Sequence, residues 1–341
     1  MPSQSSRKSF PATGKRFGKP LTAGRAPSMD RWKPFEVVVP GSTANLGSGF
    51  DSLGMAVDRF LRLRISPSDR MRMKTRGGVL EQVDLDDNNL ILRVMREAFR
   101  EKGRRLPPLL LEAESDIPLM RGLGSSAAAI VAGWTAANRL LGNPWSREEL
   151  LQRATRTEGH PDNVGASLYG GVVITSWDGR HAHLLQAETP PLTIVAAVPL
   201  VSLATSEARH VLPEHLTHGE AVLGSSRANL LTAALLTGNW EALRVGMNDR
   251  FHQPYRLSLV PGLQEMLEGA YRHGALGAAL SGAGPTVIAF TLDPESVSEY
   301  MEDVFQNLSV PADIFILRPY DRGAVVGLTN ESDRSTLLGN L

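Results

Sequence analysis

Apolar and polar residues recur along this chain in patterns that predict both strands and helices. Short apolar runs rich in β-branched residues are typical of strands. Apolar residues spaced three and four apart, with a capping residue before them or Gly after them, are typical of helices. The predicted strands are 35–39, 58–65, 109–113, 171–175, 192–198, 285–290 and 314–317, and the predicted helices are 88–102, 127–141, 146–158, 219–237, 240–250, 261–273 and 295–307. These elements interleave without the regular alternation of a barrel, and they predict two α/β-type lobes with a boundary near residues 180–205.

The first 33 residues lack this periodicity. They contain eight basic side chains and one acidic side chain, and they are rich in Ser, Pro and Gly. This composition predicts a disordered tail. It is also typical of an organellar transit peptide, and a nucleic-acid-binding or partner-binding arm is a further alternative.

Overall composition excludes several classes of chemistry. The 341 residues include no cysteine, which excludes disulfides, thiolate nucleophiles and sites built from cysteine ligands. Thirty-six basic residues balance 36 acidic residues, so nucleic acid and anionic membranes are not expected partners. No apolar run approaches the ~18 residues of a membrane span.

The candidate chemistry lies in Gly-rich segments. Residues 117–128, IPLMRGLGSSAA, follow a predicted strand and open a long helix. Gly122 and Gly124 expose backbone N–H groups, and the helix start adds unpaired donors and a positive dipole end, so this segment predicts a phosphate cradle. Ser125 and Ser126 could cap the helix, contact phosphate or bind Mg²⁺. Two further Gly-rich segments, 40–51 and 281–286, predict a pocket lined by backbone from distant parts of the chain.

The glycine motifs of other enzyme classes do not match this chain. The chain has no G-x-x-x-x-G-K-[ST] and no G-x-S-x-G, which disfavours a P-loop nucleotidase and an α/β-hydrolase. Residues 122–127 match a relaxed dinucleotide pattern, but that pattern requires the strand to run straight into the glycines, and here residues 116–121 intervene.

The segment 158–163, EGHPDN, brings two carboxylates, an imidazole and an amide together. Its Gly and Pro argue against a helix, and an acid here could hold a Mg²⁺ ion that bridges nucleotide phosphates.

Together these segments resemble the signature motifs of the GHMP small-molecule kinases and, within that superfamily, those of the homoserine kinases of threonine biosynthesis. The similar segments are 40–54, 118–128, 158–163, 205–213, 249–261 and 281–286. Gly41 and Ser48 depart from the family pattern, which often has Ala and Pro there. The resemblance implies a two-lobed α+β fold with the active site between an N-terminal lobe, 34–195, and a C-terminal lobe, 196–325, followed by a tail, 326–341.

The resemblance also implies the site residues. ATP would lie on the loop formed by Pro118, Arg121, Gly122, Leu123, Gly124, Ser125, Ser126 and Ala127. Mg²⁺ would be held by Ser125 or Ser126 and by Glu158, and the residues nearest the transferred group would be His160, Asp162 and Asn163. The pocket for L-homoserine would be built from Asn45, Asp51, His160, Arg209 and Arg256. Whether Asp162 acts as a base is left open.

The side chains themselves fit a zwitterionic substrate. Asp51 can pair with an ammonium group, and Arg209 and Arg256 can form bidentate contacts with a carboxylate. The alternatives are a GHMP kinase for another small amino acid or hydroxy acid, and a ligand sensor of the same fold without turnover. The resemblance further implies a homodimer. We expect a cytoplasmic location, or an organellar one if residues 1–33 are a transit peptide.

Overall fold

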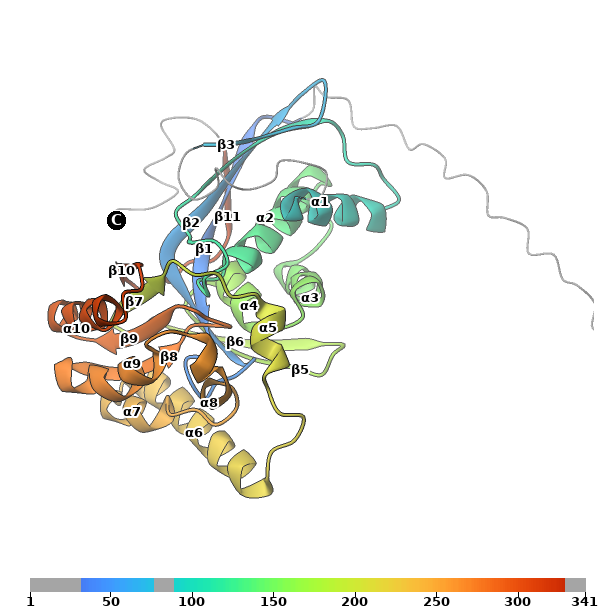
Figure 1. Cartoon of the computed structure of the whole chain (residues 1–341). Coiled ribbons are helices and arrows are strands. Elements are labelled where there is room, and N and C mark those ends of the chain that lie inside the picture. Colours follow the sequence, from blue (N-terminus) through green and yellow to red (C-terminus); the bar gives the residue numbers. More distant parts are fainter. Residues whose placement is uncertain (1–31, 77–88, 329–341) are drawn as a thin grey trace, which may run out of the picture.

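Two β-sheets organise the chain, and helices pack against each of them (Figure 1). The structure is a computed structural model that describes residues 32–76 and 89–328. Most of the predicted tail 1–33, most of the predicted tail 326–341, and Asn88 as the predicted helix cap lie outside the described residues.

The first sheet has seven strands. Its main path runs β11-β1-β2-β4-β3, and β5 pairs with both β2 and β6. The strands are β1 (Phe35–Ala44), β2 (Leu53–Pro67), β3 (Arg72–Thr75), β4 (Leu109–Ser115), β5 (Val172–Trp177), β6 (Ala182–Ala187) and β11 (Val325–Leu328). All pairs are antiparallel except β3 with β4. In β2, Leu61, Leu63 and Ile65 are buried in the core, while Arg62 and Arg64 alternate with them, as period-two patterning requires.

Four helices pack on or beside the first sheet: α1 (Leu90–Glu101), α2 (Ser125–Leu140), α3 (Arg147–Glu158) and α4 (Asp162–Tyr169). Helix α2 is apolar on nearly all sides because it contacts β1 as well as the other three helices. Ser146 and Glu149 form the predicted capping box of α3. The described cap of α1 is Asn89, whose side chain accepts a hydrogen bond from the Ile91 N–H.

The second sheet has four antiparallel strands in the order β10-β7-β9-β8. They are β7 (Thr193–Pro199), β8 (Ala275–Leu280), β9 (Val287–Thr291) and β10 (Ala312–Leu317). The α-helices after β7 are α5 (Thr205–His210), α6 (His218–Thr237), α7 (Leu243–Gly246), α8 (Gln253–Arg256), α9 (Leu263–Gly269) and α10 (Pro294–Asn307). Among the described residues, η3 (Trp240–Ala242) precedes α7, η4 (Leu257–Leu259) follows α8, and η5 (Ala270–His273) links α9 to β8.

Several predicted elements were wrong in detail. The helix predicted at 240–250 is η3 followed by the short α7, and that predicted at 261–273 is α9 followed by η5. Strands β3, β6, β8 and β11 were not predicted. The sequence of β8, ALGAAL, has no β-branched residue to indicate it. Residues 40–44, predicted as loop, complete β1.

The segment 158–163 also differs from its prediction. Gly159 ends α3 in the left-handed conformation, and Pro161 is the cap from which α4 begins at Asp162. The Gly and Pro therefore separate two helices rather than exclude one, and they place Asp162 and Asn163 in a first helical turn.

The predicted two-lobed α+β architecture is confirmed. The limits of the lobes stay a prediction, and the chain crosses between the sheets twice, since β11 returns from the second sheet to pair with β1. Within residues 32–76 and 89–328, no helix is both long and apolar enough to cross a membrane.

Candidate active site

The predicted phosphate loop lies between β4 and α2, and a loop of the second sheet supports it. Gly122 has φ 86°, and a Cβ there would lie 2.4 Å from the Ser281 carbonyl oxygen, so only glycine fits. The Ser281 hydroxyl donates to the Gly122 carbonyl at 2.6 Å, and the Thr286 hydroxyl donates to the Arg121 carbonyl. The loop 281–286 thus fixes the backbone that leads into the α2 N-terminus.

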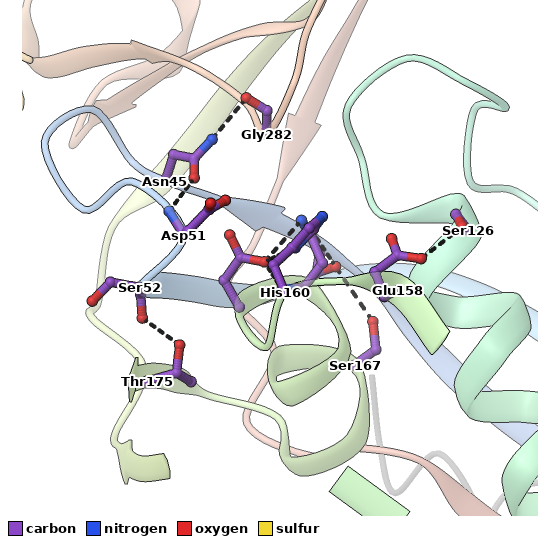
Figure 2. Close-up of polar contacts among 12 residues, drawn as sticks. Asn45, Asp51, Ser52, Ser126, Glu158, His160, Ser167, Thr175 and Gly282 are labelled. Atoms are coloured by element: carbon purple, nitrogen blue, oxygen red, sulfur yellow. Dashed lines mark hydrogen bonds and ion pairs between the residues drawn. The ribbon is translucent and has the colours of Figure 1, made fainter. Parts of the chain in front are cut away.

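A turn between β1 and β2 carries the predicted substrate residues Asn45 and Asp51 (Figure 2). The Asn45 amide nitrogen donates to the Gly282 carbonyl at 2.8 Å, and its amide oxygen accepts from the Asp51 N–H at 2.9 Å. Asn45 has φ 68°, a conformation that Asn tolerates better than most residues. One side chain therefore orients Asp51 and joins the two lobes.

The two predicted arginines lie in different environments. Arg209, on α5, forms a bidentate ion pair with Asp51, with N–O distances of 2.6 and 3.0 Å. Arg256, on α8, is 1% exposed; its Nε donates to the Ala208 carbonyl at 2.8 Å, and one Nη lies 3.2 Å from the Gly282 carbonyl. Burial, together with the nearby Arg209 charge, lowers the pKa of Arg256 to about 10, which leaves it cationic at neutral pH.

His160 and Asp162 form a tight pair. The His160 Nδ1 lies 2.5 Å from an Asp162 carboxylate oxygen, which also accepts from the Asn163 N–H at 2.6 Å. Burial lowers the pKa of His160, but the charge and the hydrogen bond of Asp162, together with the charges of Glu158 and Asp51, outweigh burial and raise the pKa to about 9. His160 is therefore an imidazolium at neutral pH, with Nδ1 bonded to Asp162.

The Asn163 amide is held by a hydroxyl of β1, which a hydroxyl of its own helix supports in turn. The Ser42 hydroxyl donates to the Asn163 amide oxygen at 2.9 Å, and the Ser167 hydroxyl donates to Ser42 at 3.3 Å. These contacts fix the orientation of the amide at the start of α4.

Ser126 lies in the first turn of α2 and Glu158 is the last residue of α3, and the two side chains face each other. The Ser126 hydroxyl donates to a Glu158 carboxylate oxygen at 2.9 Å (Figure 2), while the Ser125 hydroxyl accepts from the Met120 N–H at 3.3 Å. Burial raises the pKa of Glu158, so the carboxylate is costly to keep charged without a cation. Hard oxygen donors of this kind fit Mg²⁺, and Ser126 is the serine that faces the acid.

One pocket between the lobes collects most of the predicted residues. Those that line it are Asn45, Asp51, Arg121, Gly122, Gly124, Ser125, Ser126, Glu158, His160, Asp162, Asn163, Arg209 and Arg256. Pro118, Leu123 and Ala127 are buried and do not line it.

Eight lining residues were not predicted as site residues: Phe50, Met120, Leu203, Ala204, Thr205, Gly282, Ala283 and Gly284. Met120 and residues 282–284 lie in Gly-rich segments that were predicted to line a pocket. Phe50 directly precedes Asp51, and Thr205 opens the motif that contains Arg209, so the sequence carried a signal for these two as well.

Comparisons with known proteins identify the class. The sequence matches the GHMP kinases N terminal domain over residues 89–171 and the GHMP kinases C terminal domain over 231–307. The structure is similar to that of a mevalonate kinase at 16% identity, covering 84% of this chain and 99% of that one with a TM-score of 0.64, which shows the fold. Fold and domain matches agree on a GHMP-type small-molecule kinase.

Relatives of higher sequence identity show which family of this class the chain belongs to. A homoserine kinase of Carboxydothermus hydrogenoformans is 41% identical over 85% of this chain and 95% of its own, and one of Deinococcus radiodurans is 47% identical over 76% and 84%. The crystal structure of homoserine kinase from Cytophaga hutchinsonii matches with a TM-score of 0.77 at 29% identity, covering 87% of this chain and 98% of that one. The chain belongs to the homoserine kinase family.

Proposed function

We propose that the protein transfers the γ-phosphoryl group of ATP to the side-chain hydroxyl of L-homoserine. The products are ADP and O-phospho-L-homoserine, an intermediate of threonine biosynthesis. The new bond joins the substrate hydroxyl oxygen to phosphorus, the bond from phosphorus to the β-phosphate oxygen breaks, and the hydroxyl proton is released.

One observation carries this proposal. The same pocket has a glycine loop at a helix N-terminus and the ionic set Asp51, Arg209 and Arg256. Backbone N–H groups at a helix start suit phosphate, whereas a carboxylate beside two guanidiniums suits a substrate with both an ammonium and a carboxylate. A sugar lacks both charges, and mevalonate lacks the ammonium.

Alignment and charge account for the catalysis. The transferred phosphoryl group is loosely bonded in the transition state, so positioning and electrostatic stabilisation dominate. The helix start and the His160 imidazolium supply fixed positive charge near the phosphates. Mg²⁺, held by Ser126 and Glu158, would neutralise phosphate charge when bound.

Asp162 acts in this proposal by holding His160 rather than as the base. One of its carboxylate oxygens already accepts from the His160 ring and the Asn163 N–H. Holding the hydroxyl in line with the γ-phosphate is sufficient, because oriented reactions can gain ~7–11 kcal/mol.

The direct test is ADP release by the purified protein with ATP, Mg²⁺ and a single acceptor. L-Homoserine should support turnover, while L-threonine, mevalonate and galactose should not. Turnover on another acceptor would preserve the phosphate site and overturn the assignment of Asp51, Arg209 and Arg256. ATP binding without turnover on any acceptor would favour the sensor alternative.

A homodimer is part of the proposal. On α6, the large apolar side chains Val222, Leu223, Leu230 and Leu236 are exposed. A second copy of the chain that covered this face would remove it from water. Sedimentation velocity tests the dimer, and the double substitution Leu230→Glu and Leu236→Glu should shift the protein toward monomer.

We also propose a cytoplasmic location, because the reaction uses ATP.

A further inference from the structure

The segment that precedes Arg256 is built around a buried carboxylate. The Asp249 side chain accepts hydrogen bonds from the backbone N–H groups of Phe251, His252 and Gln253, each at 2.7 Å. The side chains of Asp249 and His252 are both 0% exposed. These contacts fix the turn that leads into α8 and orient the His252 ring.

His252 contacts both walls of the substrate pocket without lining it. Its Nε2 lies 2.9 Å from the Gly47 carbonyl oxygen, and its Nδ1 lies 3.0 Å from an Arg256 Nη. A carbonyl only accepts and a guanidinium only donates. His252 must therefore be the neutral tautomer with the proton on Nε2, in agreement with its pKa, which burial and the nearby Arg256 charge lower.

An aromatic ring reinforces this arrangement. Phe50 stacks on His252, with ring centroids 5.1 Å apart and an angle of 21° between the planes. The guanidinium carbons of Arg209 and Arg256 each lie 5.6 Å from the centre of the Phe50 ring. Gly47 and Phe50 belong to the turn that carries Asn45 and Asp51, so one buried imidazole joins this turn to the second-lobe arginine.

We propose that His252 is a positioning residue of the substrate site. It sets the distance between Asp51 and Arg256 by bonding the Gly47 carbonyl with one ring nitrogen and the Arg256 guanidinium with the other. It does not contact the substrate. The inference rests on the proposed function and adds a residue to the machinery that selects the substrate.

Three substitutions of His252 test its contacts with Gly47 and with Arg256 separately. His252→Phe keeps an aromatic ring against Phe50 but has neither hydrogen bond. His252→Gln places an amide nitrogen near the Nε2 position and can keep the bond to Gly47, whereas His252→Asn places an amide oxygen near Nδ1 and can keep the bond to Arg256. We expect His252→Phe to raise the KM for L-homoserine by about tenfold or more, since each contact is worth up to about tenfold. Each amide variant should recover part of that loss.

The ATP site provides the internal reference. The KM for ATP should change by less than about twofold in all three variants, because no His252 contact reaches the phosphate loop. His273→Phe is the matched control: His273 stacks on Tyr300 with ring centroids 4.2 Å apart, outside the pocket, and its replacement should leave both KM values unchanged.

Specific results would overturn the proposal. They are an unchanged homoserine KM in His252→Phe, or amide variants as impaired as His252→Phe, or equal losses for both substrates. If His252→Phe does not fold, the two amide variants alone test the proposal. A homoserine KM equal to that of the wild type in both of them would refute the positioning role of His252. Failure of the wild-type protein to use homoserine would instead refute the proposed function, and the same ratios would then be measured with whichever acceptor it uses.

Discussion

Asp51 and Arg209 bind each other through two hydrogen bonds at the mouth of the pocket, although each is suited to an opposite end of an amino acid. The pair is about one-third exposed. A zwitterionic substrate would replace one ion pair by two, because its ammonium can take Asp51 while its carboxylate takes Arg209. An acceptor with only one of these charges would leave the other residue without its partner.

This exchange predicts the effect of Asp51→Asn on specificity. The wild-type protein should prefer L-homoserine over 4-hydroxybutanoate, which lacks the ammonium, by roughly 100-fold or more in kcat/KM, and the variant should reduce that preference to about tenfold or less. Asp69→Asn, which removes the carboxylate of an exposed Asp69–Arg72 pair far from the pocket, is the control and should change neither value. An unaltered preference in Asp51→Asn would show that Asp51 does not recognise the ammonium.

The His160–Asp162 pair predicts how stability depends on pH. The folded-state pKa of His160, about 9, is above its usual 6.5, so the stabilisation is complete below pH 6.5 and is lost as pH rises through 9. The shift corresponds to about 3 kcal/mol. Urea unfolding at pH 6.5 and 9.5 should show this loss in the wild type and much less of it in His160→Gln. The control His183→Gln, at an exposed position on β6, should behave as the wild type does.

Glu158→Gln tests the Mg²⁺ assignment. Glutamine retains an acceptor for the Ser126 hydroxyl but removes the negative charge, so the Mg²⁺ concentration for half-maximal activity should rise about tenfold or more. Glu148→Gln changes an exposed acid of the same helix and should leave the Mg²⁺ titration unchanged. Identical titrations for both variants would remove Glu158 from the metal site.

Alanine substitutions at two serines near the pocket should change the unfolding free energy in opposite directions. The Ser48 hydroxyl is buried and has no hydrogen-bond partner among the described residues, so Ser48→Ala should raise the unfolding free energy by about 1 kcal/mol. Ser42 donates to Asn163 and accepts from Ser167, so Ser42→Ala should lower it by a similar amount. Thermal denaturation of both variants measures the contrast, and a destabilised Ser48→Ala would imply a partner for that hydroxyl.

Sequence reasoning was most informative where chemistry depends on a local motif. Most residues of two predicted motifs line the pocket: Gly122, Gly124, Ser125 and Ser126 at the start of α2, and Glu158, His160, Asp162 and Asn163 around the junction of α3 and α4. It failed at the start of α4, because Gly159 and Pro161 are equally compatible with a loop and with a helix junction. Only packing against β1 and β2 distinguishes the two.

Contacts between distant residues were beyond the sequence for a different reason. The motif resemblance named Asp51 and Arg209 for the same pocket, but nothing in either segment indicates that they bind each other across 158 positions. No sequence pattern pointed to His252, because the positioning role proposed for it depends on its contact with the Gly47 carbonyl, 205 positions away. Such contacts depend on how the two sheets are placed, which local patterns do not encode.

The return of β11 to the first sheet has a consequence for biosynthesis. A ribosome makes β1 before any other strand and β11 after all of the second sheet, yet the two pair along residues 35–38 and 325–328. Throughout that interval one side of β1 has no strand to bond, and an unpaired strand edge invites pairing with other chains. A nascent chain stopped after β10 would carry both sheets nearly complete and still expose this edge, so premature termination there would favour aggregation over a working fragment.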